Sequence, residues 1–180
     1  MKYFNYRPIF FILILGLMFS AAVRSEEGPQ KASAEVDTGP IVITSQTLEF
    51  DNKRKVVIFI GNVVAKREDF TINCQKILLY YLDSQTGRVE GKEKLKIDRI
   101  IATGQVKISR PDGGLAKAEK AIYYENDEKV ILTGNPGVKQ GTDFVEGSRI
   151  TLFLKEKRSI VEGSESKKVK AVLFPRNKKR

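Results

Sequence analysis

The sequence predicts an all-β protein made of stacked strand-turn-strand repeats. The clearest repeat spans residues 118–139, in which two apolar runs flank a polar turn at residues 125–128. A small residue followed by apolar residues three and five positions later recurs along the chain, and each copy leads into a strand that carries a glycine. The copies start at Ser45, Cys74, Ala118 and Gly147, and the glycines are Gly61, Gly104, Gly134 and Gly163. Spacings of 29 to 30 residues are typical of supersecondary units that bury their apolar faces against neighbouring copies.

Alternation within the strands supports the all-β prediction. Residues 99–108 have one apolar face and one largely polar face, which is the pattern of a half-buried strand. Turn-forming clusters such as residues 111–114 separate the apolar runs, and no segment has the length and periodicity of an amphipathic helix. The apolar face of this strand consists of Ile100, Ala102, Gly104, Val106 and Ile108.

The recurrent glycine has two interpretations. Its position in the alternation predicts that it points to the apolar side of the sheet. There it would either permit a bulge or bend that curves the sheet, or leave room in an apolar groove. Pro136 follows the third glycine in a strand continuation, and a proline cannot donate a ladder hydrogen bond. We therefore expect a bulge or an unpaired edge at this point.

The N-terminus predicts export. Lys2 and Arg7 precede a 15-residue apolar run that ends in small residues, which is the pattern of a secretory signal peptide covering residues 1–22. An uncleaved membrane anchor is the alternative, although a membrane span needs about 18 to 20 apolar residues. Residues 23–39 form a polar, flexible lead, residues 40–175 form one domain, and residues 176–180 form a basic tail.

Charge favours acidic partners. The chain has 32 Lys and Arg against 22 Asp and Glu, a net charge of +10, which falls to +8 once the two signal-peptide bases are removed. For an exported protein this balance indicates phosphate-bearing lipid or anionic glycans rather than nucleic acid. The alternative is that the basic residues only solvate the strand faces. Cys74 is the single cysteine, so an intrachain disulfide is excluded.

The residues that usually carry catalysis are missing. The chain has no histidine, which excludes histidine-based acid–base catalysis, histidine-dependent triads and histidine metal sites. The paired carboxylates at residues 127–128 fall in a turn, and Cys74 occupies the position of the small packing residue. We therefore predict no enzyme activity, no cofactor and no metal.

Several stretches resemble the LptA family of OstA-like periplasmic lipopolysaccharide transport proteins. They are residues 41–45, 56–63, 130–135, 145–151 and 168–175. The resemblance implies a β-jellyroll folded as a V-shaped pair of sheets (a "β-taco"), without catalysis. It also implies binding of the acyl chains of lipid A, the lipid part of lipopolysaccharide, between the sheets. The expected protein partners are LptC-like and LptD-like domains and further copies of the chain, joined head to tail. The polar insertion at residues 83–93 departs from the family pattern.

The same alternation selects candidate site residues. The candidate lipid-binding residues share the apolar parity of their strands, and they are Leu48, Phe50, Phe59, Ile77, Leu79, Val106, Ile108, Tyr123, Leu132, Ile150 and Leu152. The first and last strands are the candidate assembly edges, because open β architectures leave terminal strands unpaired. Their residues are Ile41, Val42, Ile43 and Thr44, then Val169, Ala171, Val172 and Leu173.

Three functions remain compatible with the sequence. The first is a lipid-carrying bridge through the periplasm. The second is an LptC-like component of the same pathway that keeps its N-terminal segment as a membrane anchor. The third is a structural β-solenoid that polymerises and carries nothing.

Overall fold

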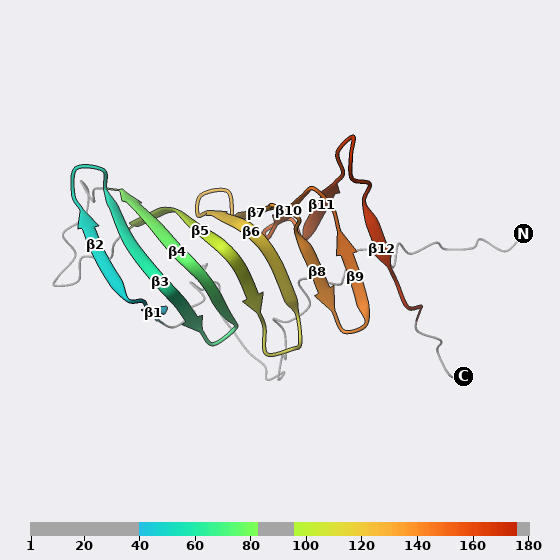
Figure 1. The fold of residues 1–180 in the computed structure, drawn as a ribbon, viewed down its shortest axis with the longest axis horizontal. Helices are drawn as coiled ribbons and strands as arrows, with labels where there is room; N and C mark the ends of the chain where they lie inside the picture. The colour runs from blue at the N-terminus through green and yellow to red at the C-terminus, as the bar shows by residue number, and fades with distance from the viewer. Residues whose placement is uncertain (1–39, 83–95, 176–180) are drawn as a thin grey trace, which may run out of the picture.

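The computed structural model describes residues 40–82 and 96–175, and this part of the chain is entirely β and irregular structure. It contains twelve strands, all paired antiparallel in one continuous hydrogen-bonded system (Figure 1). Within these residues no helix has the length and apolar character needed to cross a membrane. The strands are β1 (Val42–Thr44), β2 (Thr47–Asp51), β3 (Val56–Arg67), β4 (Phe70–Leu82), β5 (Lys96–Ser109), β6 (Leu115–Tyr124), β7 (Lys129–Thr133), β8 (Gly137–Gln140), β9 (Asp143–Glu146), β10 (Arg149–Phe153), β11 (Arg158–Glu162) and β12 (Lys170–Val172).

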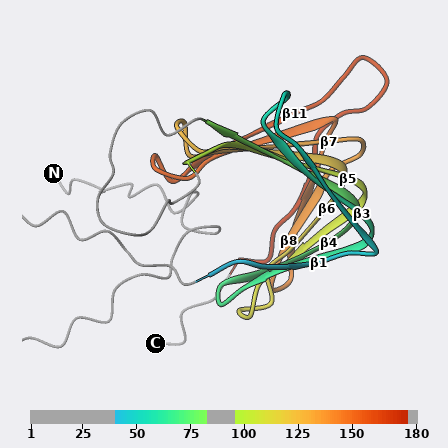
Figure 2. The ribbon, with the colours of Figure 1, turned by 90° about the vertical axis from the view of Figure 1, so that its left-hand side faces the viewer.

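Four long strands fold the system into two sheets. The first half of β3 pairs with β2 and its second half with β1. In the same way, one half of β6 pairs with β7 and the other half with β8. The upper sheet therefore holds β2, β7, β10 and β11, the lower sheet holds β1, β8, β9 and β12, and β3 to β6 belong to both. Viewed along the stack, the two sheets diverge from a shared vertex, which gives the predicted V-shaped β-jellyroll (Figure 2).

Glycines make the bends at the vertex. Gly61, Gly104 and Gly134 have φ of 85°, 81° and 76°, and each is followed by a residue that also has positive φ, namely Asn62, Gln105 and Asn135. Two successive left-handed residues turn a strand sharply, and glycine adopts this conformation at little steric cost. The strand registers shift at Gly61 and Gly104, as expected for a bulge. Gly163 differs, because it follows β11 and lies outside the strands.

The predicted direction of these glycines is wrong, whereas the predicted bend is correct. A Cβ added to Gly61, Gly104 or Gly134 would strike the side chain of Gln46, Gln75 or Glu119, respectively. All three of these polar side chains are exposed, so the glycines face the outside of the vertex rather than the apolar interior. The glycines make the bend but leave no room in a groove.

The core lies between the two sheets, and strand pairing arranges it in rows. The upper inner row consists of directly paired residues from β2 to β11: Leu48, Phe59, Ile77, Ala102, Ala121, Leu132, Ile150 and Val161. The lower inner row runs from β1 to β12: Ile43, Ala65, Ile72, Ile108, Ala116, Val138, Val145 and Ala171. Between them the vertex is filled by the buried Val63, Cys74, Val106 and Ala118.

The turns agree with the sequence analysis. At residues 110–114 the N–H of Arg110 donates to the carbonyl of Gly114 (2.8 Å) and closes the hairpin between β5 and β6. Pro136 is buried between β7 and β8, where the chain passes from the upper to the lower sheet, so its missing N–H interrupts no ladder. The predicted signal peptide (1–22), lead (23–39), insertion (83–93) and basic tail (176–180) lie outside the described residues.

Candidate binding groove and assembly edges

The inner faces of the two sheets, called here the candidate groove, carry apolar rows whose packing loosens away from the vertex. Ile77, Leu132 and Ile150 in the upper inner row are each 1% exposed. A second upper row lies one residue pair farther from the vertex, and most of its members are half-buried. It consists of Phe50, Val57, Leu79, Ile100, Tyr123, Val130, Leu152 and Ser159. The vertex side of the groove is thus packed core, while the side toward the mouth retains accessible apolar surface.

Opposite the vertex, the described parts of the two sheets are not joined by strand pairing. Among residues 40–82 and 96–175, no strand pairs the far rim of the upper sheet with the far rim of the lower sheet. The two walls therefore meet only at the vertex (Figure 2). A V-shaped pair of apolar walls needs either mutual closure or a ligand to shield it from water.

The structure brings all eleven candidate lipid-binding residues to the inner face. Leu48, Phe59, Ile77, Leu132 and Ile150 lie in the upper inner row, and Phe50, Leu79, Tyr123 and Leu152 lie in the second upper row. Ile108 is in the lower inner row and Val106 at the vertex.

These residues occupy three different environments. Ile77, Val106, Leu132 and Ile150 are completely buried and act as core. Leu48 and Phe50 on the terminal strand β2 are 50% and 64% exposed, because only β3 lies beside them. The remaining five lie on the accessible walls: Phe59, Leu79, Ile108, Tyr123 and Leu152.

Most of the inner face of the lower sheet was not predictable from alternation. Ile43, Ile72, Ala116 and Val138 pack against the core from the lower sheet, and Ile100 and Val130 do so from the upper sheet. Alternation predicts an apolar face for Ile100, but strand register is needed to show that Ile100 and Val130 are paired through Tyr123 in one row. Ile43 had been assigned only to an assembly edge.

Two titratable groups sit in this apolar environment. Burial raises the pKa of Tyr123 to about 12, and the nearby negative charge of Glu125 adds to the effect. Burial also raises the pKa of the Cys74 thiol, which is 5% exposed and belongs to the core cluster. Both groups are therefore neutral at physiological pH. The described residues contain no cluster of acidic, histidine or cysteine side chains that could hold a metal ion.

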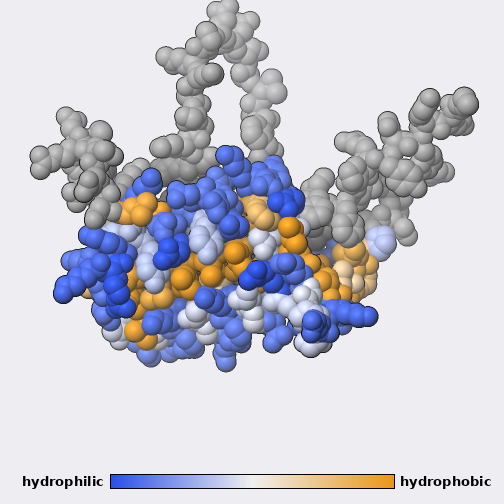
Figure 3. All heavy atoms as spheres, turned by 90° about the horizontal axis from the view of Figure 1, so that it is seen from above, coloured by the Kyte–Doolittle hydropathy of each residue, from blue (hydrophilic) through white to orange (hydrophobic). Residues whose placement is uncertain are grey.

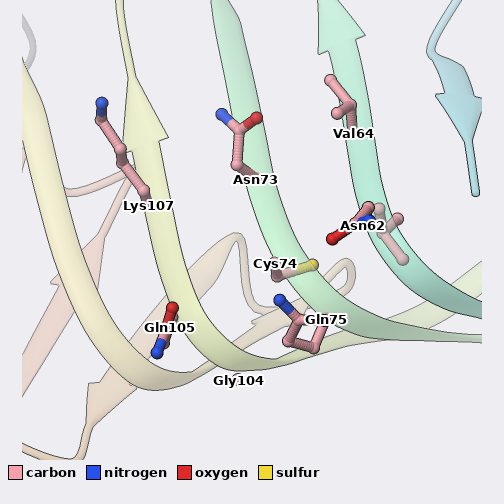
Figure 4. Close-up of a pocket in the computed structure, with 9 residues that line it drawn as sticks. Asn62, Val64, Asn73, Cys74, Gln75, Gly104, Gln105 and Lys107 are labelled. Atoms are coloured by element: carbon pink, nitrogen blue, oxygen red, sulfur yellow. The ribbon is translucent and has the colours of Figure 1, made fainter.

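Two small pockets lie at the vertex. One pocket of about 260 Å³ is on the outer side of the vertex, where Asn73 and Lys107 project from neighbouring strands and Gln75 and Gln105 lie at the bend (Figure 4). A second pocket, of about 350 Å³, adjoins it and includes Lys117. Polar side chains such as Asn73, Gln105 and Lys107 line these depressions together with valine and alanine side chains.

The candidate assembly edges are edge strands of the lower sheet. β1 pairs only with β3, and β12 pairs only with β9. Ile43 and Ala171 end the lower inner row, while Val42 and Val172 belong to the opposite face. Thr44 completes β1, and Ile41, Val169 and Leu173 flank the two strands. The sequence analysis did not identify β2 and β11 as the corresponding edges of the upper sheet.

Comparison with known proteins identifies the family. Residues 42–158 match the model of the LptA/(LptD N-terminal domain) LPS transport protein family. The chain belongs to this family. The lipopolysaccharide export system protein LptA of Escherichia coli K12 is 26% identical over 163 residues, which cover 91% of this chain and 86% of that protein. LptA of Haemophilus influenzae is 29% identical over 136 residues, covering 76% of this chain and 77% of its own length.

A solved structure confirms the fold. LptH, described as the LptA-homologous periplasmic component of the lipopolysaccharide transport device of Pseudomonas aeruginosa, superposes with a TM-score of 0.62 at 15% identity. The alignment covers 76% of this chain and 96% of the LptH chain. The all-β jellyroll predicted from the sequence is therefore the architecture of the family.

Proposed function

We propose that the protein is a non-enzymatic periplasmic carrier that moves lipopolysaccharide by holding its acyl chains in the apolar groove. The observation that carries the proposal is the continuity of the inner rows. Each strand from β2 to β11 that crosses the upper inner row contributes an aliphatic or aromatic side chain to it, beginning with Leu48 and ending with Val161. The lower inner row is likewise aliphatic throughout, from Ile43 on β1 to Ala171 on β12. The relatives named for lipopolysaccharide export and the family match support the same substrate.

The energetics favour acyl chains. Burying one chain of about a dozen carbons at ~0.8 kcal/mol per methylene stabilises the bound state by roughly 10 kcal/mol before ordering costs. The half-buried walls at Ile100, Val130 and Leu152 supply apolar contacts of this kind without disrupting the packed vertex. This interaction is not charge-based, so we expect it to weaken only modestly with salt.

Assembly would extend the groove. Both inner rows run to the terminal strands, so stacking β11 and β12 of one copy against β2 and β1 of the next places Val161 near Leu48 and Ala171 near Ile43. The two ends differ, so the contact is heterologous and generates an open chain rather than a closed dimer. LptC-like and LptD-like proteins of the same fold would continue the stack toward the two membranes.

Native mass spectrometry of protein recovered from its own envelope tests the proposal. We expect a bound species with the mass of lipopolysaccharide. The double substitution Ile100→Thr and Val130→Thr should reduce occupancy, because it makes the groove wall polar while keeping β-branched side chains. The control, Val64→Thr, changes a β-branched residue on the outer face of the lower sheet and should leave occupancy unchanged. Absence of lipid from the unaltered protein would favour a structural β-solenoid that carries nothing.

The anchored alternative requires a separate measurement. Export is expected to remove residues 1–22. The intact mass of protein purified from the envelope shows whether this segment has been cleaved. Retention of the segment in a form that needs detergent would make the protein an LptC-like membrane component instead.

A further inference from the structure

The outer face of the upper sheet carries an apolar row that the groove does not use. The members of this outer stripe are direct cross-strand partners on β3 to β11, and they are Ile58, Leu78, Ile101, Ile122, Ile131, Thr151 and Ile160. Ile58 and Thr151 are buried, so the accessible part consists of the four half-buried residues Leu78, Ile101, Ile122 and Ile131 and the exposed Ile160. Seven strands at a spacing of ~4.8 Å give a band roughly 30 Å long. Figure 3 shows the band running along the molecule between two hydrophilic borders.

The border nearer the vertex is cationic. Lys76 and Lys120 lie in the row beside the outer stripe, with Thr103 directly between them, and Arg149 continues the row on β10. The ion pairs found among residues 40–82 and 96–175 involve none of the three cations. Among the outward-facing residues that flank the outer stripe from β4 to β10, the carboxylate is Glu119, at the vertex beside Lys120, and Glu162 on β11 is the direct cross-strand partner of Arg149. The terminal strands β2 and β11 carry the other acidic residues of this face.

The border nearer the groove mouth alternates aromatic and cationic side chains. The Arg99 guanidinium lies 4.2 Å from the ring centre of Tyr80, the Lys129 ammonium 5.0 Å from that of Tyr124, and the Arg158 guanidinium 4.0 Å from that of Phe153. These cations also pair with acidic residues, Arg99 with Asp98 on β5 and Lys129 and Arg158 with Asp127 and Glu156 in the adjoining turns, at 2.7 to 2.9 Å. Amphipathic rings stacked with cations beside an apolar strip are typical of surfaces at a membrane–water interface.

The lower sheet does not share this pattern. Its outer face next to the vertex is lined by Val64, Asn73, Lys107 and Lys117, which are direct cross-strand partners. β propensity alone would produce β-branched residues on the outer faces of both sheets, and an antiparallel sheet exposed to water normally shows polar residues there. The apolar stripe is therefore a feature of one face.

We propose that the outer face of the upper sheet docks on the surface of an anionic phospholipid membrane. The outer stripe would contact the acyl boundary, the rim aromatics the headgroup level, and the cations Lys76, Lys120 and Arg149 the lipid phosphates. A second copy of the chain is a poor partner for this face, because a twofold-symmetric contact would bring the cations of one copy close to those of the other. A fluid bilayer also adapts to a twisted convex sheet, whereas a protein partner needs a matching concave surface.

Vesicle flotation with matched charge variants tests the proposal. Protein recovered from the periplasm should float with vesicles of phosphatidylglycerol and phosphatidylcholine, should not float with phosphatidylcholine alone, and should be released by high salt. The variant K76Q/K120Q/R149Q should bind roughly a hundredfold more weakly, since each cation near an anionic surface contributes about fivefold. The control K66Q/K107Q/K117Q removes the same charge from the outer lower face and should bind within about twofold of the unaltered protein. Equal losses in the two variants, or no binding to anionic vesicles, would overturn the proposal.

A position-specific fluorophore provides the second readout. An environment-sensitive NBD label on Ile131→Cys should shift to the blue when anionic vesicles are added, while the same label on Lys117→Cys should not. The native Cys74 is buried with a raised pKa, so labelling is directed to the introduced cysteine. A label at position 131 that ignores vesicles but responds to a periplasmic extract would assign the face to a protein partner and overturn the membrane proposal.

Discussion

The backbone N–H of Glu119 donates a hydrogen bond to the carbonyl of Gly134 (3.1 Å), and the Gly134 Cα lies directly against the Glu119 side chain. The same relationship recurs at the first bend, where the N–H of Gln46 donates to the carbonyl of Gly61 (3.1 Å). Neighbouring strands thus bend at the same level, because each glycine leaves space for the polar side chain of the strand beside it. This packing allows one set of strands to build both walls of the groove.

Alanine at a vertex glycine should be strongly destabilising. Gly104→Ala and Gly134→Ala each combine a positive φ, which costs roughly 1 to 2 kcal/mol, with a clash against Gln75 or Glu119. We expect each to lower the free energy of unfolding by about 3 kcal/mol in urea denaturation. Gly113→Ala is the control, since Gly113 has φ of 86° but no atom within 4 Å of an added Cβ. If all three variants lost the same free energy of unfolding, the contacts with Gln75 and Glu119 would contribute nothing to the destabilisation.

Sequence periodicity was sufficient for the strands and turns but not for the direction of the glycines. Simple alternation assigned Gly61 and Gly104 to the apolar face, because it counts every residue as extended. Two consecutive left-handed residues break that count, and a pattern of apolar and polar residues carries no information on φ. The Gly-Asn pairs at residues 61–62 and 134–135 were a usable signal, since asparagine tolerates the left-handed conformation better than most residues.

The division between core and groove wall also required three-dimensional information. Ile77 and Leu79 have the same parity and similar chemistry, yet Ile77 is 1% exposed and Leu79 is only half-buried. The difference depends on distance from the vertex, which is set by where the strand bends. Likewise, β2 is an edge because β3 changes partner from β2 to β1 along its length, and β11 is an edge because it pairs with β10 alone. Local sequence does not encode these pairings.

Alanine substitutions in the upper inner row should cost more stability in the packed core than at the edge strand. Ile77→Ala should lower the free energy of unfolding by about 2 to 5 kcal/mol, because the side chain is 1% exposed and would leave a cavity. Leu48→Ala removes a residue of the same row that is 50% exposed on the terminal strand, and we expect a loss below about 1 kcal/mol. Thermal or urea unfolding of the two variants measures the difference. Comparable losses would contradict the packing gradient.

Tyr123 should make the protein less stable at alkaline pH. Its pKa is about 12 in the folded protein, against an ordinary value of 10.0, because burial disfavours the phenolate. The unfolded chain therefore releases the proton first as pH rises, and stability falls between about pH 10 and 12. Tyr123→Phe should show a shallower decline over this range, whereas Tyr124→Phe, on the opposite face, should retain the steep decline. Identical pH profiles for the unaltered protein and Tyr123→Phe would refute the assignment.

Assembly should depend on the terminal strands. Deletion of residues 168–180 removes β12 and uncovers β9, and we expect it to abolish concentration-dependent head-to-tail oligomers while the remaining domain stays folded. Sedimentation velocity measures the oligomers and circular dichroism checks the fold. A monomer at high concentration in the unaltered protein, with crosslinkers at Ile43 and Val172 that never join two molecules or reach a like-folded partner, would rule out the bridge.

Site-specific photo-crosslinking tests the central claim, lipid transport in the groove, most directly. A photoreactive amino acid at Leu79, Ile108 or Tyr123 lies on the inner walls, while one at Thr103 or Lys107 lies on the outer faces of the same sheets. Irradiation in living cells should capture lipopolysaccharide from the three inner positions and not from the two outer ones. Equal capture from both faces, or capture from neither, would contradict the account.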